Sequence, residues 1–188
     1  MMFNRWKLGF LAVFLVASCL FSPLSAIGQP SSQAGCSGNV LVNPGFEDGF
    51  SDRGAGEVSV ANGWFPWYQD GPGQNDGFYR RPEYKPEDAS RYGTRRIHSG
   101  NWAQKFFSTY ATHNAGVFQQ VKLPAGSRLT LSAWAQIWSS QDPNPDTVVE
   151  PGNYRVHIGI DPHGGTDWNS PNVVWSSGFM EYNTWLRL

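Results

Sequence analysis

The sequence predicts an all-β protein, and three observations support that prediction. The 188 residues include 21 Gly and 13 Pro, a composition typical of a chain that turns often. Aromatic residues make up 15% of the chain, with 9 Trp, and aromatic side chains favour strands. Residues 127–138 alternate apolar and polar side chains with a period of two. A chain of this length is expected to form one domain with a sizeable core.

The strand predicted at residues 127–138 organises the rest of the chain. One set of its side chains forms a core face, namely Leu129, Leu131, Ala133, Ala135 and Ile137. On the opposite face Gln136 lies between Trp134 and Trp138, which is unusual for a solvated sheet. An indole stacks on the apolar face of a sugar while an amide bonds its hydroxyls, so this face is a candidate glycan platform. The alternative is that a second sheet or a loop covers both faces and that Trp134 is core.

The charge of the chain disfavours several classes of partner. Charged residues make up only 15% of the chain, and the formal net charge is −1. Nothing therefore steers the protein to phosphate backbones or acidic membranes, and nucleic acid is not an expected partner. Basic residues between positions 80 and 96, Arg96 among them, alternate with Glu and Asp. They predict a solvated loop face whose charges neutralise one another.

The N-terminus predicts an export signal. Arg5 and Lys7 precede an apolar run over residues 8–21, and Pro23 breaks that run before small residues. The run is too short to be a permanent membrane span. We therefore expect residues 1–28 to be a signal peptide cleaved before Gln29, residues 29–38 to be a linker, and the protein to be secreted to the extracellular space.

A second interpretation of the N-terminus starts from its first cysteine. The residues Val-Ala-Ser-Cys that end at Cys19 resemble the bacterial lipobox, in which the cysteine becomes the lipidated first residue. A lipid anchor at Cys19 would hold the protein at the bacterial cell surface. With cleavage before Gln29, Cys36 is the one cysteine left in the mature chain. No intrachain disulfide is then expected, and stability comes from the core, with a metal as a further source.

A series of motifs along residues 39–188 resembles a known family. In order they read NVLVNPGFEDG, GW, HSGNWA, GVFQQV, LPAG and LTLSAWAQ. In these motifs the chain is similar to carbohydrate-binding modules of the cellulose-binding type, which share a galactose-binding-domain-like β-jelly roll. The resemblance implies a jelly-roll β-sandwich over residues 39–188. Because the family's ligands vary and some members are structural modules only, the motifs indicate fold more than substrate.

The resemblance also implies a structural calcium ion near a first strand at residues 39–42. In the family the acidic residue of the first motif and a backbone carbonyl bind the ion, which on this chain would be Glu47 and the carbonyl of Gly45. Both are the hard oxygen ligands that Ca²⁺ takes. The alternative is that Glu47 is a solvated turn residue.

The resemblance has a gap at its C-terminal end. Family members close with an aspartate-rich strand, and the sequence reaches Leu188 without one. We therefore expect a jelly roll that lacks its last strands, which leaves backbone edges and part of the core open. A truncated chain or fragment is the favoured explanation, and a strand from another chain is the alternative.

Residues 49–96 form a long stretch that is rich in aromatic side chains and weakly patterned. A segment of this length inside a compact domain is usually functional, and the family places binding loops here. Trp64 is expected to begin a core strand, as its family counterpart does. Trp67 and Tyr68 follow Pro66 and are expected at the rim of the ligand platform, with ordinary loop packing as the alternative.

A later strand supplies two more candidate residues. Residues 153–160 alternate again, so that Arg155 and His157 point away from an apolar face. If this strand lies in the same sheet as residues 127–138, Arg155 and His157 would join Trp134 and Gln136 on the ligand face. The alternative for a lone strand histidine is a structural or simply exposed position.

The favoured function is non-catalytic binding of a polysaccharide through the aromatic strand face. The residues expected to bind are Trp134, Gln136, Trp138, Arg155 and His157, with Trp67 and Tyr68 at the rim. One alternative is a structural or adhesive surface module that binds no sugar, and the other is a fragment of a glycoside hydrolase or another polysaccharide-active enzyme. No serine elbow, H-E-x-x-H motif or phosphate loop occurs in the sequence, so no catalysis by this chain is expected.

The three functions differ in what they require of the structure. Binding requires Trp134 or Trp138 to be accessible to solvent, whereas a purely structural role requires both to be covered. Glycoside hydrolysis requires two carboxylates that face one cleft. The exposure of the two tryptophans is therefore the first feature to establish.

Overall fold

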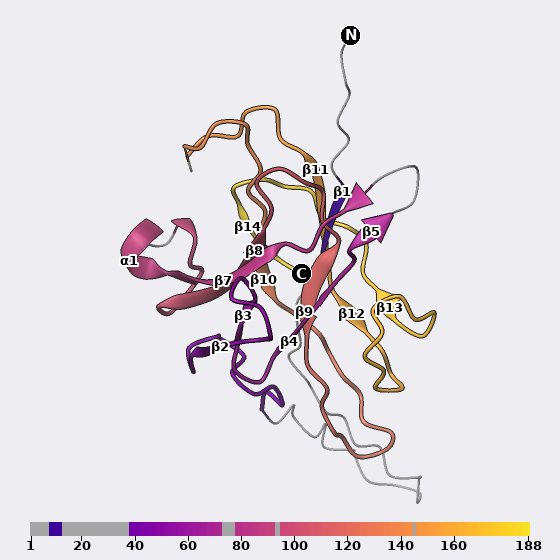
Figure 1. The fold of residues 1–188 in the computed structure, drawn as a ribbon. Helices are drawn as coiled ribbons and strands as arrows, with labels where there is room; N and C mark the ends of the chain where they lie inside the picture. The colour runs from indigo at the N-terminus through magenta and orange to yellow at the C-terminus, as the bar shows by residue number, and fades with distance from the viewer. Residues whose placement is uncertain (1–7, 13–37, 73–77, 93–94, 145) are drawn as a thin grey trace, which may run out of the picture.

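The structure is a computed structural model that describes residues 8–12, 38–72, 78–92, 95–144 and 146–188. Within these ranges the chain is strand and turn apart from one helical turn, α1 (Ala89–Tyr92), which confirms the all-β prediction (Figure 1). No helix in this part of the chain is long and apolar enough to cross a bilayer. The remaining residues of the predicted signal peptide and linker lie outside the described ranges.

The strands are short. They are β1 (Leu8–Ala12), β2 (Phe50–Asp52), β3 (Ser59–Ala61), β4 (Phe65–Tyr68), β5 (Gly71–Pro72), β6 (Phe78–Tyr79), β7 (Glu83–Asp88), β8 (Trp102–Phe107), β9 (Ala115–Phe118), β10 (Trp134–Gln136), β11 (Asn153–His157), β12 (Gly159–Ile160), β13 (Val174–Trp175) and β14 (Trp185–Arg187). Frequent glycines and prolines account for this, because proline cannot donate to a ladder and glycine weakens one.

The described strands pair two by two. The antiparallel pairs are β2–β3, β4–β9, β5–β6, β7–β8, β10–β14 and β12–β13, and β1 with β11 is the one parallel pair among them. Isolated bridges extend the pairing to residues outside the strands, such as Val58 with Tyr84 of β7 and Phe179 with Val156 of β11. The described strands do not close into a barrel.

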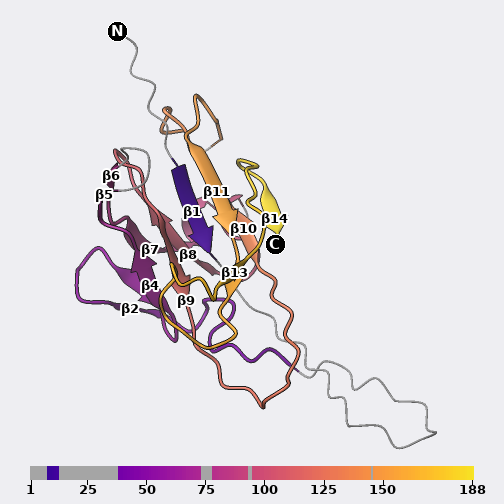
Figure 2. The ribbon, with the colours of Figure 1, turned by 90° about the vertical axis from the view of Figure 1, so that its right-hand side faces the viewer.

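Two hydrophobic clusters form the core. The larger cluster gathers Leu41, Val58, Val60, Ala61, Trp64, Tyr84, Ala115 and Val117. The smaller cluster gathers Ala135, Ile137 and Val156, with Tyr154, Tyr182 and Leu188 packed against them. Figure 2 shows β2, β4, β7, β8 and β9 on one side and β10, β11 and β14 on the other, with β1 between the two groups.

Trp64 occupies the centre of the larger cluster, as the sequence predicts. Its side chain is 0% exposed, and its Nε1 donates to the carbonyl oxygen of Asn43 at 2.9 Å. The indole is therefore buried with its one polar atom satisfied, which is the condition for a buried tryptophan to stabilise a core. Strand β4 begins at the next residue, so the predicted core position at the start of a strand is confirmed.

The predicted first strand, residues 39–42, does not form a strand. Leu41 is buried in the larger cluster, but the neighbouring backbone pairs with a side chain instead of another strand. The Gln119 amide accepts from Val42 N at 2.8 Å and donates to the Val42 carbonyl at 3.0 Å. The side chain of one glutamine thus takes the place of a neighbouring strand, so residues 39–42 form no β-ladder.

Candidate functional site

The outward face of β10 carries the residues that the sequence singled out. Trp134 and Trp138 are 47% and 39% exposed, while Ala135 and Ile137 between them are buried. Gln136 lies between the two tryptophans on the same side of the strand. The alternation expected for this stretch therefore holds at residues 134–138.

Strand β14 widens this face. Its register places Trp185 opposite Gln136 and Arg187 opposite Trp134. Register partners in an antiparallel pair share a face, so these two side chains lie beside the β10 residues. Trp185 contacts the ring of His98 edge-on at 5.4 Å between centroids.

His98 joins this face from the segment that precedes β8. Its imidazole stacks on the indole of Trp134, with the ring centroids 4.1 Å apart and the planes 17° from parallel. The stack fixes the orientation of Trp134, because offset parallel rings are a favoured aromatic geometry. His98 is itself exposed, so the stacked pair lies at the surface.

Arg96 connects Gln136, Asn183 and Trp138. Its Nη1 donates to Oε1 of Gln136 at 2.8 Å and to Oδ1 of Asn183 at 2.7 Å. Its guanidinium carbon lies 5.0 Å from the centre of the Trp138 ring, within the range of a cation–π contact. The guanidinium therefore forms a planar, positively charged centre beside Trp138 and Gln136.

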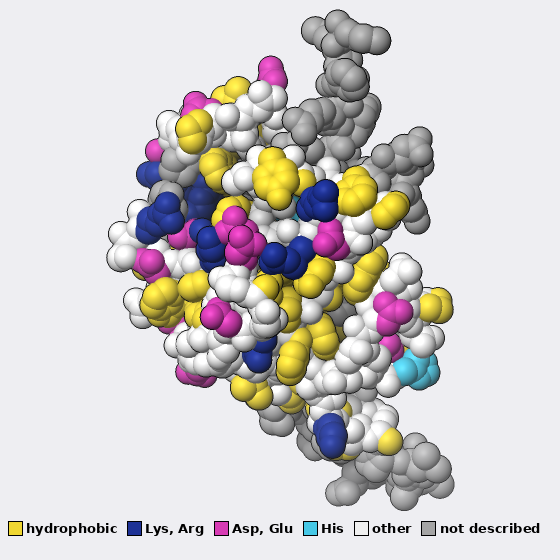
Figure 3. Space-filling view, viewed as in Figure 1, with side chains coloured by type: hydrophobic (Ala, Val, Ile, Leu, Met, Phe, Trp, Pro, Cys, Tyr) yellow, Lys and Arg dark blue, Asp and Glu magenta, His cyan; other side chains and the backbone are white. Residues whose placement is uncertain are grey.

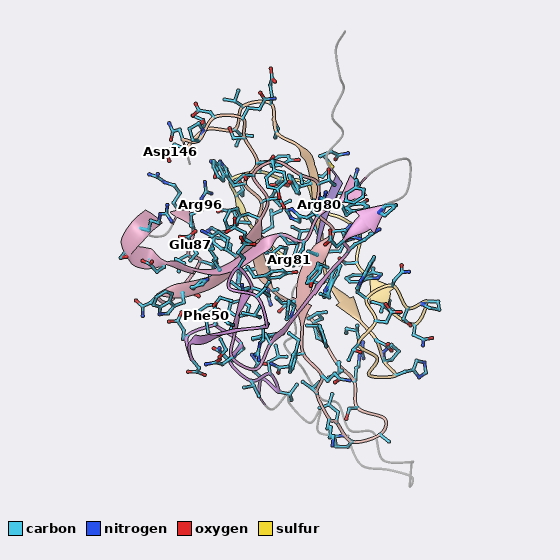
Figure 4. The ribbon with its side chains drawn as sticks, in the orientation of Figure 1. Phe50, Arg80, Arg81, Glu87, Arg96 and Asp146 are labelled. Atoms are coloured by element: carbon cyan, nitrogen blue, oxygen red, sulfur yellow. The ribbon has the colours of Figure 1, made fainter. Side chains whose placement is uncertain are left out.

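The loop after β10 holds the far end of the face. Nε1 of Trp138 donates to the carbonyl of Thr147 at 3.0 Å, and Asp146 accepts from Arg95 at 2.7 Å. Figure 4 shows Arg96 and Asp146 on the same side of the molecule. We call the set Trp134, Gln136, Trp138, Arg96, His98, Asn183 and Trp185 the β10 face.

Exposure alone does not distinguish the β10 face from other parts of the surface. Hydrophobic side chains lie exposed at several places in Figure 3, and Phe65, Phe78 and Tyr110 are more exposed than Trp138. The β10 face differs because its indoles flank hydrogen-bonding groups that are held in place. This combination of flat apolar surface and fixed donors and acceptors is what binds a polar ring.

Trp67 and Tyr68 lie on β4, away from the strand that carries the β10 face. Trp67 is only 8% exposed, and Trp168 stacks on it with ring centroids 4.8 Å apart and planes at 17°. Its indole also lies over Gly116, where a Cβ would come within 2.6 Å of Nε1. Tyr68 is 42% exposed. The structure therefore offers Tyr68 to solvent and packs Trp67 beneath Trp168.

Arg155 and His157 lie on β11, which pairs with β1, whereas β10 pairs with β14. Both side chains pack against Gly178. Nδ1 of His157 lies 3.0 Å from the Ser176 carbonyl, and its ring meets Trp175 at 6.4 Å between centroids. The contacts of these two residues are thus beside Trp175, and a ligand role for them remains a prediction at that place.

Glu47 closes a loop next to the predicted calcium site. Its Oε1 accepts from the backbone N–H groups of Asn101 and Trp102, at 3.0 Å each. A carboxylate so engaged keeps lone pairs for a cation. In the part of the chain that the structure describes, no group of three or more His, Cys, Asp or Glu side chains could hold a metal. Calcium at Glu47 and the Gly45 carbonyl therefore remains a prediction.

Sequence reasoning missed four members of the β10 face, and Trp185 is one of them. Arg96 was expected on a solvated loop, His98 was noted only as part of a motif, and Asn183 was not considered. Asn183 has a φ of 59°, a left-handed conformation that asparagine tolerates, and this positions its side chain toward Arg96. No local pattern signals these residues, because they reach β10 from other segments of the chain: Arg96 contacts Gln136 across 40 positions, and His98 stacks on an indole of β10.

No protein-family model matches the chain, and searches of curated proteins and of solved structures returned no significant match. The fold and site therefore define the class of protein no further than an all-β protein with an exposed aromatic strand face.

Proposed function

We propose that the protein binds a polysaccharide non-catalytically through the β10 face. The observation that carries this proposal is the exposure of Trp134 and Trp138 on either side of Gln136. A purely structural module would cover both indoles. Two stacking platforms with a hydrogen-bonding centre between them suit consecutive sugar rings of a chain.

Arg96 is the polar centre of the proposed site. Its guanidinium carries several N–H groups in one plane, and its hydrogen bonds to Gln136 and Asn183 help to hold that plane in place. Sugar hydroxyls accept hydrogen bonds from such a donor set without reorganising it. Each stack or hydrogen bond contributes about 1 kcal/mol, so several together give modest affinity.

The setting of the site extends the proposal. The module is a jelly-roll β-sandwich that the cell secretes, with a calcium ion at Gly45 and Glu47. The β-rich pairing and the two-sided core support the sandwich. The positively charged start and apolar run of the N-terminus support export. A lipid anchor at Cys19 is the alternative to free secretion.

Isothermal titration calorimetry of the folded protein with soluble β- and α-glucans, xylan and mannan tests the function. The double variant Trp134→Ala, Trp138→Ala is expected to lose at least about tenfold in affinity for the glycan that binds, because two stacks are removed. Arg96→Lys is expected to weaken binding as well, since lysine keeps the charge but not the planar donor set.

Trp102→Ala is the matched control. Trp102 is 38% exposed, nearly the same as Trp138, but it lies on β8 beside Phe50. The variant Trp102→Ala should therefore leave the affinity for the glycan unchanged. Equal binding by the double variant would move the site away from β10, and a folded protein that binds none of the glycans would favour a structural surface module.

A further inference from the structure

Strand β1 occupies a slot between the two halves of the core. It runs parallel to β11 in the register Leu8 with Asn153 through Ala12 with His157. On its other side it lies against β9, a strand of the larger cluster (Figures 1 and 2). A five-residue segment from the start of the chain thus lies between β9 and β11.

The backbone of β11 shows which of its groups need this neighbour. Val156 exchanges two hydrogen bonds with Phe179, at 3.0 Å each. Successive residues of a strand point their N–H and C=O groups to opposite sides, so those of Arg155 face β1. In a parallel pair these groups meet the two neighbours of the register partner, which is Phe10. The facing residues on β1 are therefore Gly9 and Leu11.

The same five residues belong to the apolar run of the predicted export signal. Cleavage before Gln29 would remove all of β1 and leave the Arg155 side of β11 without a backbone partner. Both strands that flank this slot contribute buried apolar side chains, since Val117 on β9 and Val156 on β11 are 1% and 2% exposed. An open strand edge beside an apolar core is a template for a further strand.

We propose that the slot between β9 and β11 is a strand-acceptor site in the exported protein. Its ligand is an extended, apolar segment of about five residues, donated by another polypeptide and paired parallel to β11. Residues 8–12 occupy the acceptor site until cleavage of the signal peptide removes them. The proposal is independent of glycan binding, because it concerns a different strand and a polypeptide ligand.

Mass spectrometry of the exported protein provides the first test. The proposal expects the mature chain to begin after residue 12. An exported protein that retains residues 8–12 would keep its own strand in the slot and would overturn the proposal.

Hydrogen exchange of the full chain provides the second test. The variant Gly9→Pro, Leu11→Pro removes both N–H groups that face β11. The amides of Arg155 and His157 should then exchange at least about tenfold faster, while the amide of Val156 stays protected by Phe179. Unchanged exchange at Arg155 would show that the slot does not depend on β1, and the proposal would fail.

A peptide that copies residues 7–13 then serves as the donated strand. Added to the proline variant, it should restore slow exchange at Arg155 and His157, and the same peptide with Leu11→Pro should not. If the variant chain is unfolded, folding on addition of the peptide supports the site, and no folding refutes it. If slow exchange at Arg155 and His157 returns without peptide when the protein concentration is raised, the slot would instead be assigned to a second copy of this chain.

Discussion

His113 is a buried histidine that contacts aromatic side chains of both core clusters. Its ring centre lies 6.1 Å from that of Phe106 and 5.3 Å from that of Tyr154. Burial lowers the pKa of His113 from 6.5 to about 4 and raises the pKa of Tyr154 to about 12. In both cases loss of hydration disfavours the charged form, so the two residues are neutral in the folded protein at pH 7.

The folded protein should lose stability in mild acid because of His113. Above pH 6.5 the histidine is neutral in both the folded and the unfolded chain. Between pH 6.5 and about 4 the unfolded chain takes up a proton that the folded protein excludes, so the free energy of unfolding falls as the pH falls. The shift corresponds to about 3 kcal/mol as an upper value. Urea unfolding at pH 7.0, 5.5 and 4.5 measures it.

The variant His113→Phe should flatten this pH dependence, and His163→Phe is the matched control because His163 is exposed. A wild-type chain and a His113→Phe variant with the same slope of stability against pH would contradict the assignment of the effect to His113.

At the same scale, sequence reasoning succeeded where the signal was local. The period of two placed Trp134, Gln136 and Trp138 on one face, and the structure exposes both indoles. Arg96 and His98 could not be found this way, because they contact β10 only after distant segments have packed. The buried position of His113 likewise depends on two clusters that meet in space.

At the scale of elements, one carboxylate fixes two loops. Glu47 accepts hydrogen bonds from the backbone N–H groups of Asn101 and of Trp102, the first residue of β8. Gly100 has a φ of 74°, and a Cβ there would collide with the Glu47 carboxylate. The loop before β8 thus needs both a glycine and an acceptor, which explains the pairing of these two motifs in the chain.

Calcium should stabilise the protein through Glu47. The variant Glu47→Gln keeps one oxygen acceptor but loses the charge, so its stability should fall by about 1–2 kcal/mol. Added CaCl₂ is expected to raise the Tm of the wild-type chain, and a chelator to lower it, with neither change in Glu47→Gln. Differential scanning calorimetry measures these shifts.

The neighbouring substitution Asp48→Asn is the control for this experiment and should keep the calcium response. A Tm that is the same in calcium and in chelator for the wild-type chain would contradict the predicted site and leave Glu47 with loop closure alone.

Element boundaries and partners were harder to predict than element type. A strand at residues 39–42 was expected from its apolar residues, but the amide of Gln119 takes the place of a strand partner. The face of β11 was predicted from its alternation, since Val156 and Ile158 are buried. The strand that pairs with β11 was not predicted, because strand pairing is decided by contacts between residues far apart in sequence.

At the scale of the whole molecule, charge contributes little. The net charge is −1, and the ion pairs of the described residues are mostly at the surface. Affinity for a neutral glycan should therefore change less than about twofold between 50 and 500 mM NaCl, because screening acts mainly on exposed charges. Calorimetric titrations at the two salt concentrations test this expectation.

A strong loss of affinity with salt would contradict the neutral-glycan expectation. It would assign recognition instead to the positive charges of Arg96 and Arg187 and so to an acidic polysaccharide. Substitution of the exposed Arg187 by Gln would then reduce the salt dependence, whereas Lys122→Gln, an exposed lysine outside the β10 face, would leave it unchanged.

Many contacts in this chain join residues that are far apart in sequence, and such contacts slow folding. Gln119 bonds Val42, 77 positions earlier, and the β10–β14 pair joins residues 134 and 187. Domains dominated by such distant pairings fold in milliseconds to seconds, because large loops must close before any contact is gained. A chain that folds this slowly stays unfolded for longer after synthesis, which is compatible with the proposed export through a narrow translocation pore.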